Sequence, residues 1–142
     1  MAIANLSEII QSSILRRNQL QFEVSELSTQ KQLLALSQGD TNSALSSAKS
    51  ALREQFKEMF DTDSDLRCEY TDYTEIPEFQ EELDKLTARF EDELEQLAAQ
   101  ETAIDAQITT NSTELTEINA YLQQYKQYMT SNIQEDFNFG LS

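Results

Sequence analysis

The sequence predicts an all-α protein, a long antiparallel helical hairpin with the character of a coiled coil. Three observations support this fold class. The 142 residues include one Pro and two Gly, so few positions interrupt a helix. An apolar stripe runs through the C-terminal half at helical spacing, and the N-terminal half has a second, weaker one. Between them lies a short acidic stretch without periodicity. We expect one domain over residues 1–142, because the chain has single-domain length.

The N-terminal half predicts two helices, over residues 6–37 and 42–60. Gly39-Asp40 is a helix-stop signal, and Asp40 or Thr41 is a suitable cap for the helix that follows. Alternatively, the second helix continues the first with a kink. The polar residues Ser13, Arg17 and Lys31 interrupt the apolar seam of the first helix, which comprises Leu6, Ile10, Leu20, Val24, Leu27 and Leu34, flanked by Ile14, Leu15, Phe22 and Leu33.

Residues 61–76 have no helical periodicity and predict the hairpin turn, a loop with at most one short strand. Folding at this turn would place residues 1–60 against residues 77–132, two segments of similar length. A parallel dimer of extended chains is the alternative arrangement.

The same loop contains a candidate metal site. Its carboxylates have nearly the spacing of the oxygen ligands in a calcium-binding helix-loop-helix. The match departs from that motif at Leu66, where the sharp turn needs a glycine, and at Cys68, where an apolar β-branched residue is usual. An acidic, solvated turn is the simpler interpretation. The candidate calcium ligands are Asp61, Asp63, Asp65, Glu69 and Asp72.

The longest helix is predicted over residues 77–132. Pro77 suits a first helical turn, and the acidic residues after it complement the positive end of the helix dipole. Two consecutive steps of four, Leu86 to Phe90 to Leu94, predict a local unwinding of the supercoil. The polar seam residues Glu101 and Asn111 are candidates for fixing register or oligomeric state. The apolar stripe, also the predicted self-association seam, comprises Phe90, Leu94, Leu97, Ile104, Ile108, Leu115, Ile118, Leu122, Tyr125 and Met129.

Residues 133–142 predict an apolar tail that follows the helix. Phe137, Phe139 and Leu141 alternate with other residues, a pattern typical of a strand or of a segment that docks in a groove of a partner. Alternatively, the tail folds back onto its own hairpin.

Charge and composition exclude several classes of function. The net charge is −16, with +1 in residues 1–53, −14 in residues 54–105 and −3 in residues 106–142. Such a field repels phosphate, so we expect no binding to nucleic acid or to anionic membrane surfaces. The chain has no His, which removes the commonest general base and metal ligand. We therefore expect no enzymatic activity and no cofactor other than the candidate calcium ion.

The sequence offers little about the compartment. The single cysteine, Cys68, cannot form a disulfide within the chain. The N-terminus has no pattern of a cleavable signal peptide, and no apolar run reaches the roughly 20 residues of a membrane span. We expect a soluble protein, either cytoplasmic or exported without a cleaved signal.

Three segments carry a resemblance to known proteins: residues 17–23 (RNQLQFE), 30–36 (QKQLLAL) and 131–139 (SNIQEDFNF). They resemble the ends of short, uncharacterised helical proteins of gut bacteria, a group that implies a helical fold and no activity. In composition, with helical ends, no Trp and one Cys, the chain is similar to flagellin-like axial subunits. That resemblance implies a secreted, filament-forming role.

These observations favour a structural or assembly protein, a self-associating coiled-coil subunit, for example of an extracellular or secreted filament. The long seam would be buried against residues 6–34 and against neighbouring copies, with a homo-oligomer as the expected state. The alternative is an acidic adaptor or secretion-chaperone-like module that binds a protein partner. A calcium-binding helical protein is the third interpretation.

Overall fold

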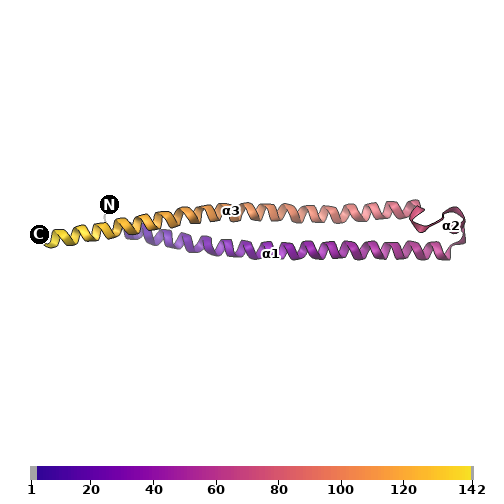
Figure 1. Ribbon diagram of the computed structural model, residues 1–142, viewed down its shortest axis with the longest axis horizontal. Coiled ribbons are helices and arrows are strands. Elements are labelled where there is room, and N and C mark those ends of the chain that lie inside the picture. The colour runs from indigo at the N-terminus through magenta and orange to yellow at the C-terminus, as the bar shows by residue number, and fades with distance from the viewer. Residues whose placement is uncertain (1–2, 142) are drawn as a thin grey trace. The chain divides into compact units, whose positions relative to one another are not determined.

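The computed structural model describes the backbone of residues 3–141 and the side chains of residues 4–135. It contains four elements: α1 (Ile3–Thr62), α2 (Ser64–Glu69), the 3-10 helix η1 (Tyr73–Glu75) and α3 (Pro77–Leu141). Residues 3–141 contain no strand, so the all-α prediction is confirmed. Helices α2 and η1 lie in the connection from α1 to α3 (Figure 1).

Helix α1 is continuous through Gly39, which corrects the predicted break between residues 37 and 42. Gly39 does not adopt a positive φ, so it does not act as a helix cap. A glycine inside a helix costs only about 1 kcal/mol relative to alanine. The inward-facing positions continue past it at spacings of three and four, since Leu34, Gln38, Thr41 and Leu45 are all half-buried. Packing on both sides of Gly39 therefore offsets its cost.

The predicted loop over residues 61–76 is largely helical, which is a second correction. Asp63 caps α2, because its side chain accepts a hydrogen bond of 2.9 Å from the backbone N–H of Asp65. On either side of this connection in the sequence, three apolar residues are buried together, namely Phe56, Ile76 and Phe79. The ring of Phe79 lies edge-to-face with Phe56 at 5.4 Å and with Tyr73 at 5.3 Å. This apolar cluster fixes the connection between the long helices.

Helix α3 begins at Pro77 and continues past the predicted end near residue 132 to Leu141. The backbone of residues 133–141 is helical, so the strand, one of the alternatives for this tail, is wrong. Gln134 and Glu135 favour helix, and no glycine occurs in α3 before Gly140. The side chains of Phe137, Phe139 and Leu141 lie outside the described residues.

Contacts within the chain gather into two compact units, each with a segment of both long helices. Unit 1 consists of Met1–Lys31 and Ala103–Ser142, and unit 2 of Gln32–Thr102. In unit 1, Arg16 contacts Glu114 and Lys31 contacts Asp105, so the two segments run in opposite directions. In unit 2, α1 and α3 pack against each other through the cluster around Phe56 and Phe79.

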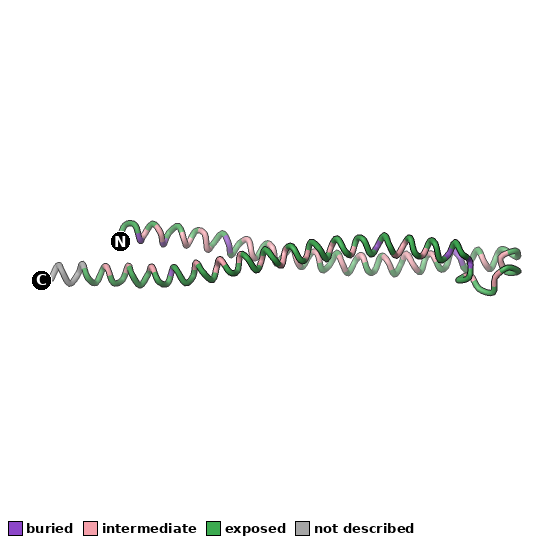
Figure 2. The backbone as a smooth tube through the Cα atoms, turned by 90° about the horizontal axis from the view of Figure 1, so that it is seen from above, coloured by how far each residue is buried: buried purple, intermediate pink, exposed green. Residues whose placement is uncertain are grey.

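Inside each unit, the covered positions recur every three or four residues along both helices, with exposed residues between them (Figure 2). Leu6, at 1% exposure, and Leu20, at 0%, are the most deeply buried side chains of unit 1. Unit 2 has the double step of four on both helices, at Leu86, Phe90 and Leu94 of α3 and at Ala48, Leu52 and Phe56 of α1. Two helices that change period in the same unit can remain in contact.

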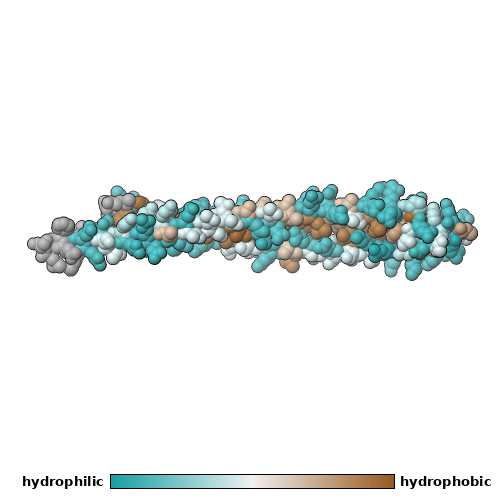
Figure 3. All heavy atoms as spheres, turned by 45° about the horizontal axis from the view of Figure 1, so that its top comes forward, coloured by the Kyte–Doolittle hydropathy of each residue, from teal (hydrophilic) through white to brown (hydrophobic). Residues whose placement is uncertain are grey.

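The resulting core is narrow. Among the described residues, no polar or charged side chain is buried, and the buried apolar ones are few. On the face shown in Figure 3, apolar residues form small patches among hydrophilic ones. In the described part of the chain, no helical segment is apolar enough to cross a membrane.

Candidate interaction surfaces

The predicted seam of α3 faces inward within its own chain. All ten residues are buried or half-buried: Phe90, Leu94 and Leu97 in unit 2, and Ile104, Ile108, Leu115, Ile118, Leu122, Tyr125 and Met129 in unit 1. A side chain that α1 already covers offers little area to another copy. The periodicity thus identified a packing face of α3, and this face is occupied inside the chain.

Polar side chains pair across the two helices of unit 1. Arg16 donates two hydrogen bonds to Glu114, Nε to Oε1 at 3.0 Å and Nη2 to Oε2 at 3.1 Å. The bond to Glu114 raises the pKa of Arg16 above its ordinary value. Lys31 Nζ lies 2.7 Å from Asp105 Oδ1. These side chains are about 40% exposed, so solvent weakens the pairs, and their main effect is to select the register of the helices.

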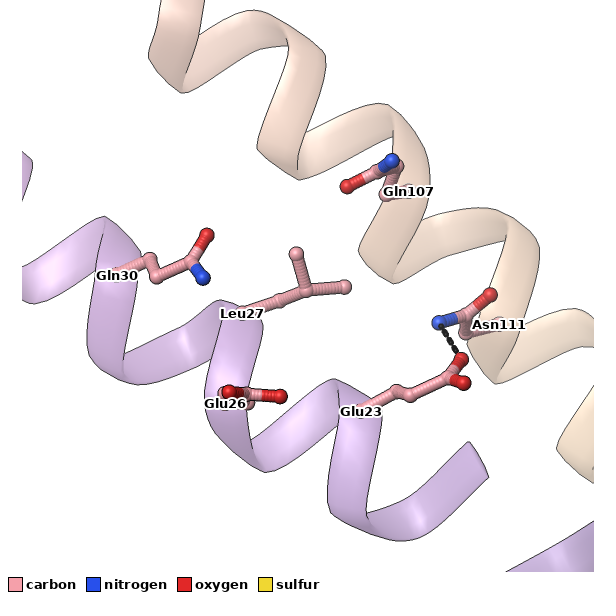
Figure 4. A pocket seen from close by; sticks show the side chains of 6 residues that line it. All are labelled: Glu23, Glu26, Leu27, Gln30, Gln107 and Asn111. Carbon is pink, nitrogen blue, oxygen red and sulfur yellow. Dashed lines mark hydrogen bonds between the residues drawn. The ribbon is translucent and has the colours of Figure 1, made fainter. Parts of the chain in front are cut away.

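A shallow hollow lies between α1 and α3 in unit 1 (Figure 4). Leu27 reaches toward α3, and Asn111 Nδ2 donates a hydrogen bond of 3.2 Å to Glu23 Oε2. Asn111 was predicted to help set register, and here it contacts the opposite helix. The hollow contains two carboxylates, those of Glu23 and Glu26, with the amides of Gln30 and Gln107 at its edges.

In unit 2, the other polar seam residue also contacts the opposite helix. Gln38 Nε2 donates a hydrogen bond of 3.1 Å to Glu101 Oε2. Near the turn, burial raises the pKa of Tyr70, and the neighbouring carboxylates of Glu69 and Glu78 raise it further. Cys68 is exposed on α2.

The structure distributes the candidate calcium ligands over several elements. Asp61 lies in the last turn of α1, Asp63 caps α2, Asp65 and Glu69 belong to α2, and Asp72 precedes η1. Two of these carboxylates already have local partners. The Asp63 carboxylate accepts the capping hydrogen bond from the backbone N–H of Asp65, and Asp72 Oδ2 accepts a hydrogen bond of 2.8 Å from the Thr74 hydroxyl. In the described part of the chain, no three acidic or Cys side chains are grouped to hold a metal ion. The structure therefore does not bring the five residues together.

Large apolar side chains remain exposed on α1. In unit 1, Leu15 is 70% and Phe22 68% exposed. In unit 2, Leu33 is 58% and Leu36 65% exposed. Sequence reasoning placed Leu15, Phe22 and Leu33 beside the seam, because it could not separate the inner from the outer face of an isolated helix. On α3, Tyr121 and Tyr128 of unit 1 are each 51% exposed.

Acidic side chains cover the first part of α3 in unit 2. Eight carboxylates between residues 78 and 95 are all exposed: Glu78, Glu81, Glu82, Asp84, Glu91, Asp92, Glu93 and Glu95. Among them, Glu81 lies 3.4 Å from Lys85 on the same helix. This surface offers charge to a cationic partner, and one of its carboxylates, Glu93, also lines a shallow hollow together with Ser37 and Thr41 of α1.

These features define a class of protein, an acidic chain of two long, mutually packed helices with exposed apolar and acidic surfaces. The comparisons with known proteins do not narrow this class, because no family model, no curated protein and no solved structure matches the chain.

Proposed function

We propose that this chain is a structural subunit, a helical hairpin of coiled-coil character that associates with further copies of itself. Two observations support the hairpin. The pairs Arg16 with Glu114 and Lys31 with Asp105 run antiparallel in unit 1. The covered positions recur at spacings of three and four along α1 and α3, as in a packed helix pair.

The observation that carries self-association is the apolar surface that the hairpin leaves uncovered. Four apolar side chains of α1 are each more than half exposed: Leu15 and Phe22 of unit 1, and Leu33 and Leu36 of unit 2. The seam was expected to serve both the hairpin and its neighbours. Since the seam is covered within the chain, we assign the contacts between copies to the outer face of α1.

The test is the mass of the protein in solution. Light scattering at micromolar concentration should give at least twice the chain mass of 16.3 kDa. Electron microscopy of the same sample distinguishes a closed oligomer from a filament. A mass of 16.3 kDa throughout the micromolar range would refute the proposal.

A second candidate function, an acidic adaptor or secretion-chaperone-like module, is favoured by the exposed carboxylates of residues 78–95. Such a surface attracts a basic partner and should bind it in a salt-dependent manner. Replacing Glu91, Glu93 and Glu95 by Gln and Asp92 by Asn removes four charges at nearly constant side-chain size. These substitutions should then abolish binding to a basic partner while self-association remains. Loss of self-association with retained binding would contradict this candidate.

A further inference from the structure

We infer that the outer face of α1 in unit 1 docks against the same face of a second copy, with the two α1 helices antiparallel. This inference rests on the proposed function and names the surface and the register. The face is a line of exposed positions on α1 at spacings of three and four, namely Glu8, Gln11, Leu15, Asn18, Gln19, Phe22, Glu26 and Thr29. We call it the outer stripe.

The apolar part of the outer stripe lies near its middle. Leu15 and Phe22 are 70% and 68% exposed. They are seven residues apart, so they lie on the same side of the helix, separated by about 20° around its axis. Asn18 and Gln19, between them, are uncharged. Their amide oxygens accept hydrogen bonds from Arg17 and Arg16, and their amide NH2 groups can donate to another chain. Two apolar side chains with amides between them suit the same face of a second α1, because apolar side chains then meet apolar ones and amides meet amides.

Charge selects a second copy as the occupant. Residues 1–53 have a net charge of +1, whereas residues 54–105 have −14, so two copies approach with least repulsion through the N-terminal part of α1. Within the outer stripe, only Glu8 and Glu26 are charged. Two basic side chains reach the middle of the stripe, Arg16 at Gln19 and Arg17 at Asn18, but Arg16 is already paired with Glu114, which leaves little positive charge for an acidic ligand. The two carboxylates of the stripe are too far apart, about 27 Å along the helix, to form one cation site.

The order of residues selects the antiparallel register. When two copies meet with a two-fold axis between Asn18 and Gln19, Leu15 lies opposite Phe22 of the other copy. Glu26 then lies opposite Gln11, and Glu8 opposite Thr29. A parallel arrangement in register would instead oppose Glu8 to Glu8 and Glu26 to Glu26, which like-charge repulsion disfavours. The antiparallel register thus buries both apolar side chains of each copy without opposing two carboxylates.

The first experiment compares two double variants of the full chain by light scattering over a concentration series. Leu15→Gln with Phe22→Gln removes four apolar side chains from a dimer and should weaken association by about a hundredfold or more. Leu33→Gln with Leu36→Gln is the matched control in unit 2. In the inferred register, position 33 meets Ala4 at the start of the other α1, so this variant should change association by less than about threefold. If both double variants weaken association equally, the assignment to the outer stripe of unit 1 is wrong.

The second experiment tests the register with single cysteines in a Cys68→Ser background. Asn18→Cys should form a disulfide between copies, because position 18 lies beside the two-fold axis. Gln11→Cys should not, since its two copies would be about 22 Å apart along the helices, well beyond disulfide reach. Mixing Gln11→Cys with Glu26→Cys should restore the cross-link. Cross-linking of Gln11→Cys alone would establish a parallel contact and overturn the inferred register.

The two proposals fail in different ways. If the wild-type chain is a monomer, the proposed function fails and this inference fails with it. If the wild type is an oligomer and the Leu15→Gln, Phe22→Gln variant has the same mass and affinity, self-association stands and the inferred surface is wrong.

Discussion

Leu20 provides the sharpest test of the helix pairing. It lies on α1 in unit 1 and is fully covered, with 0% exposure. Leu20→Ala removes buried apolar area, and buried Leu→Ala substitutions generally cost about 2–5 kcal/mol. Because the core of a helix pair is narrow, neighbouring side chains and water can partly fill the space. We therefore expect a loss at the lower end, about 2–3 kcal/mol in the free energy of unfolding.

The matched control is Leu33→Ala, the same substitution on the same helix at a side chain that is 58% exposed. It should cost less than about 0.5 kcal/mol, since alanine favours helix and little packing is lost. Urea unfolding followed by circular dichroism measures the free energy of unfolding of both variants. All samples are kept at one protein concentration, because association raises apparent stability. Equal losses for the two variants would refute the assignment of inner and outer faces on α1.

Three further predictions concern α1 and the turn. Gly39→Ala should raise the free energy of unfolding by about 0.5–1 kcal/mol, because nothing lies within 4 Å of the added methyl group. The reverse substitution Ala35→Gly should lower the free energy of unfolding by a similar amount. Destabilisation by Gly39→Ala would instead support the predicted helix break. Calcium at millimolar concentration should leave the melting temperature unchanged, and a rise that Asp63→Asn abolishes would contradict the observed placement of the turn carboxylates. Tyr70 has a pKa raised above 10.0 in the folded state, so its stabilising contribution is complete below pH 10 and is lost as the pH rises through the folded-state value. Tyr70→Phe should therefore lose less stability above pH 10 than the wild type does, and identical pH profiles would refute the raised pKa of Tyr70.

The sequence predicted the inner face of α3 because that face is nearly all apolar. From Phe90 to Met129, a period near 3.5 residues is visible without knowledge of the partner, and each of the ten apolar positions is covered in the structure. The inner face of α1 was harder to predict because it includes Ser13, Arg17, Lys31, Gln38 and Thr41, all half-buried. Ser13, Arg17 and Lys31 were interpreted as interruptions, although long side chains such as Arg17 and Lys31 can cover apolar surface with their stems.

The errors of prediction have physical causes. Gly39 was assigned to a helix end from local propensity, which packing of the flanking positions overrides. Helix α2 has six residues, too few to display a period. The pair of Arg16 and Glu114 is separated by 98 positions, so it depends on a register that neither segment reveals alone. Exposure of Leu15 and Phe22 likewise follows from which side of α1 meets α3.

The most direct test of the account is a zero-length cross-link between Lys31 and Asp105, whose Nζ and Oδ1 atoms are 2.7 Å apart. A carbodiimide joins such a pair without any substitution, and Lys85 with Glu81, 3.4 Å apart on α3, is the internal control. In the band with the mass of one chain, mass spectrometry should identify both cross-links. Mixing isotope-labelled and unlabelled protein distinguishes a link within one chain from a link between two chains. If the Lys31–Asp105 link forms only between two chains, or if only the control link forms, α1 and α3 do not pair within one chain and the hairpin is wrong.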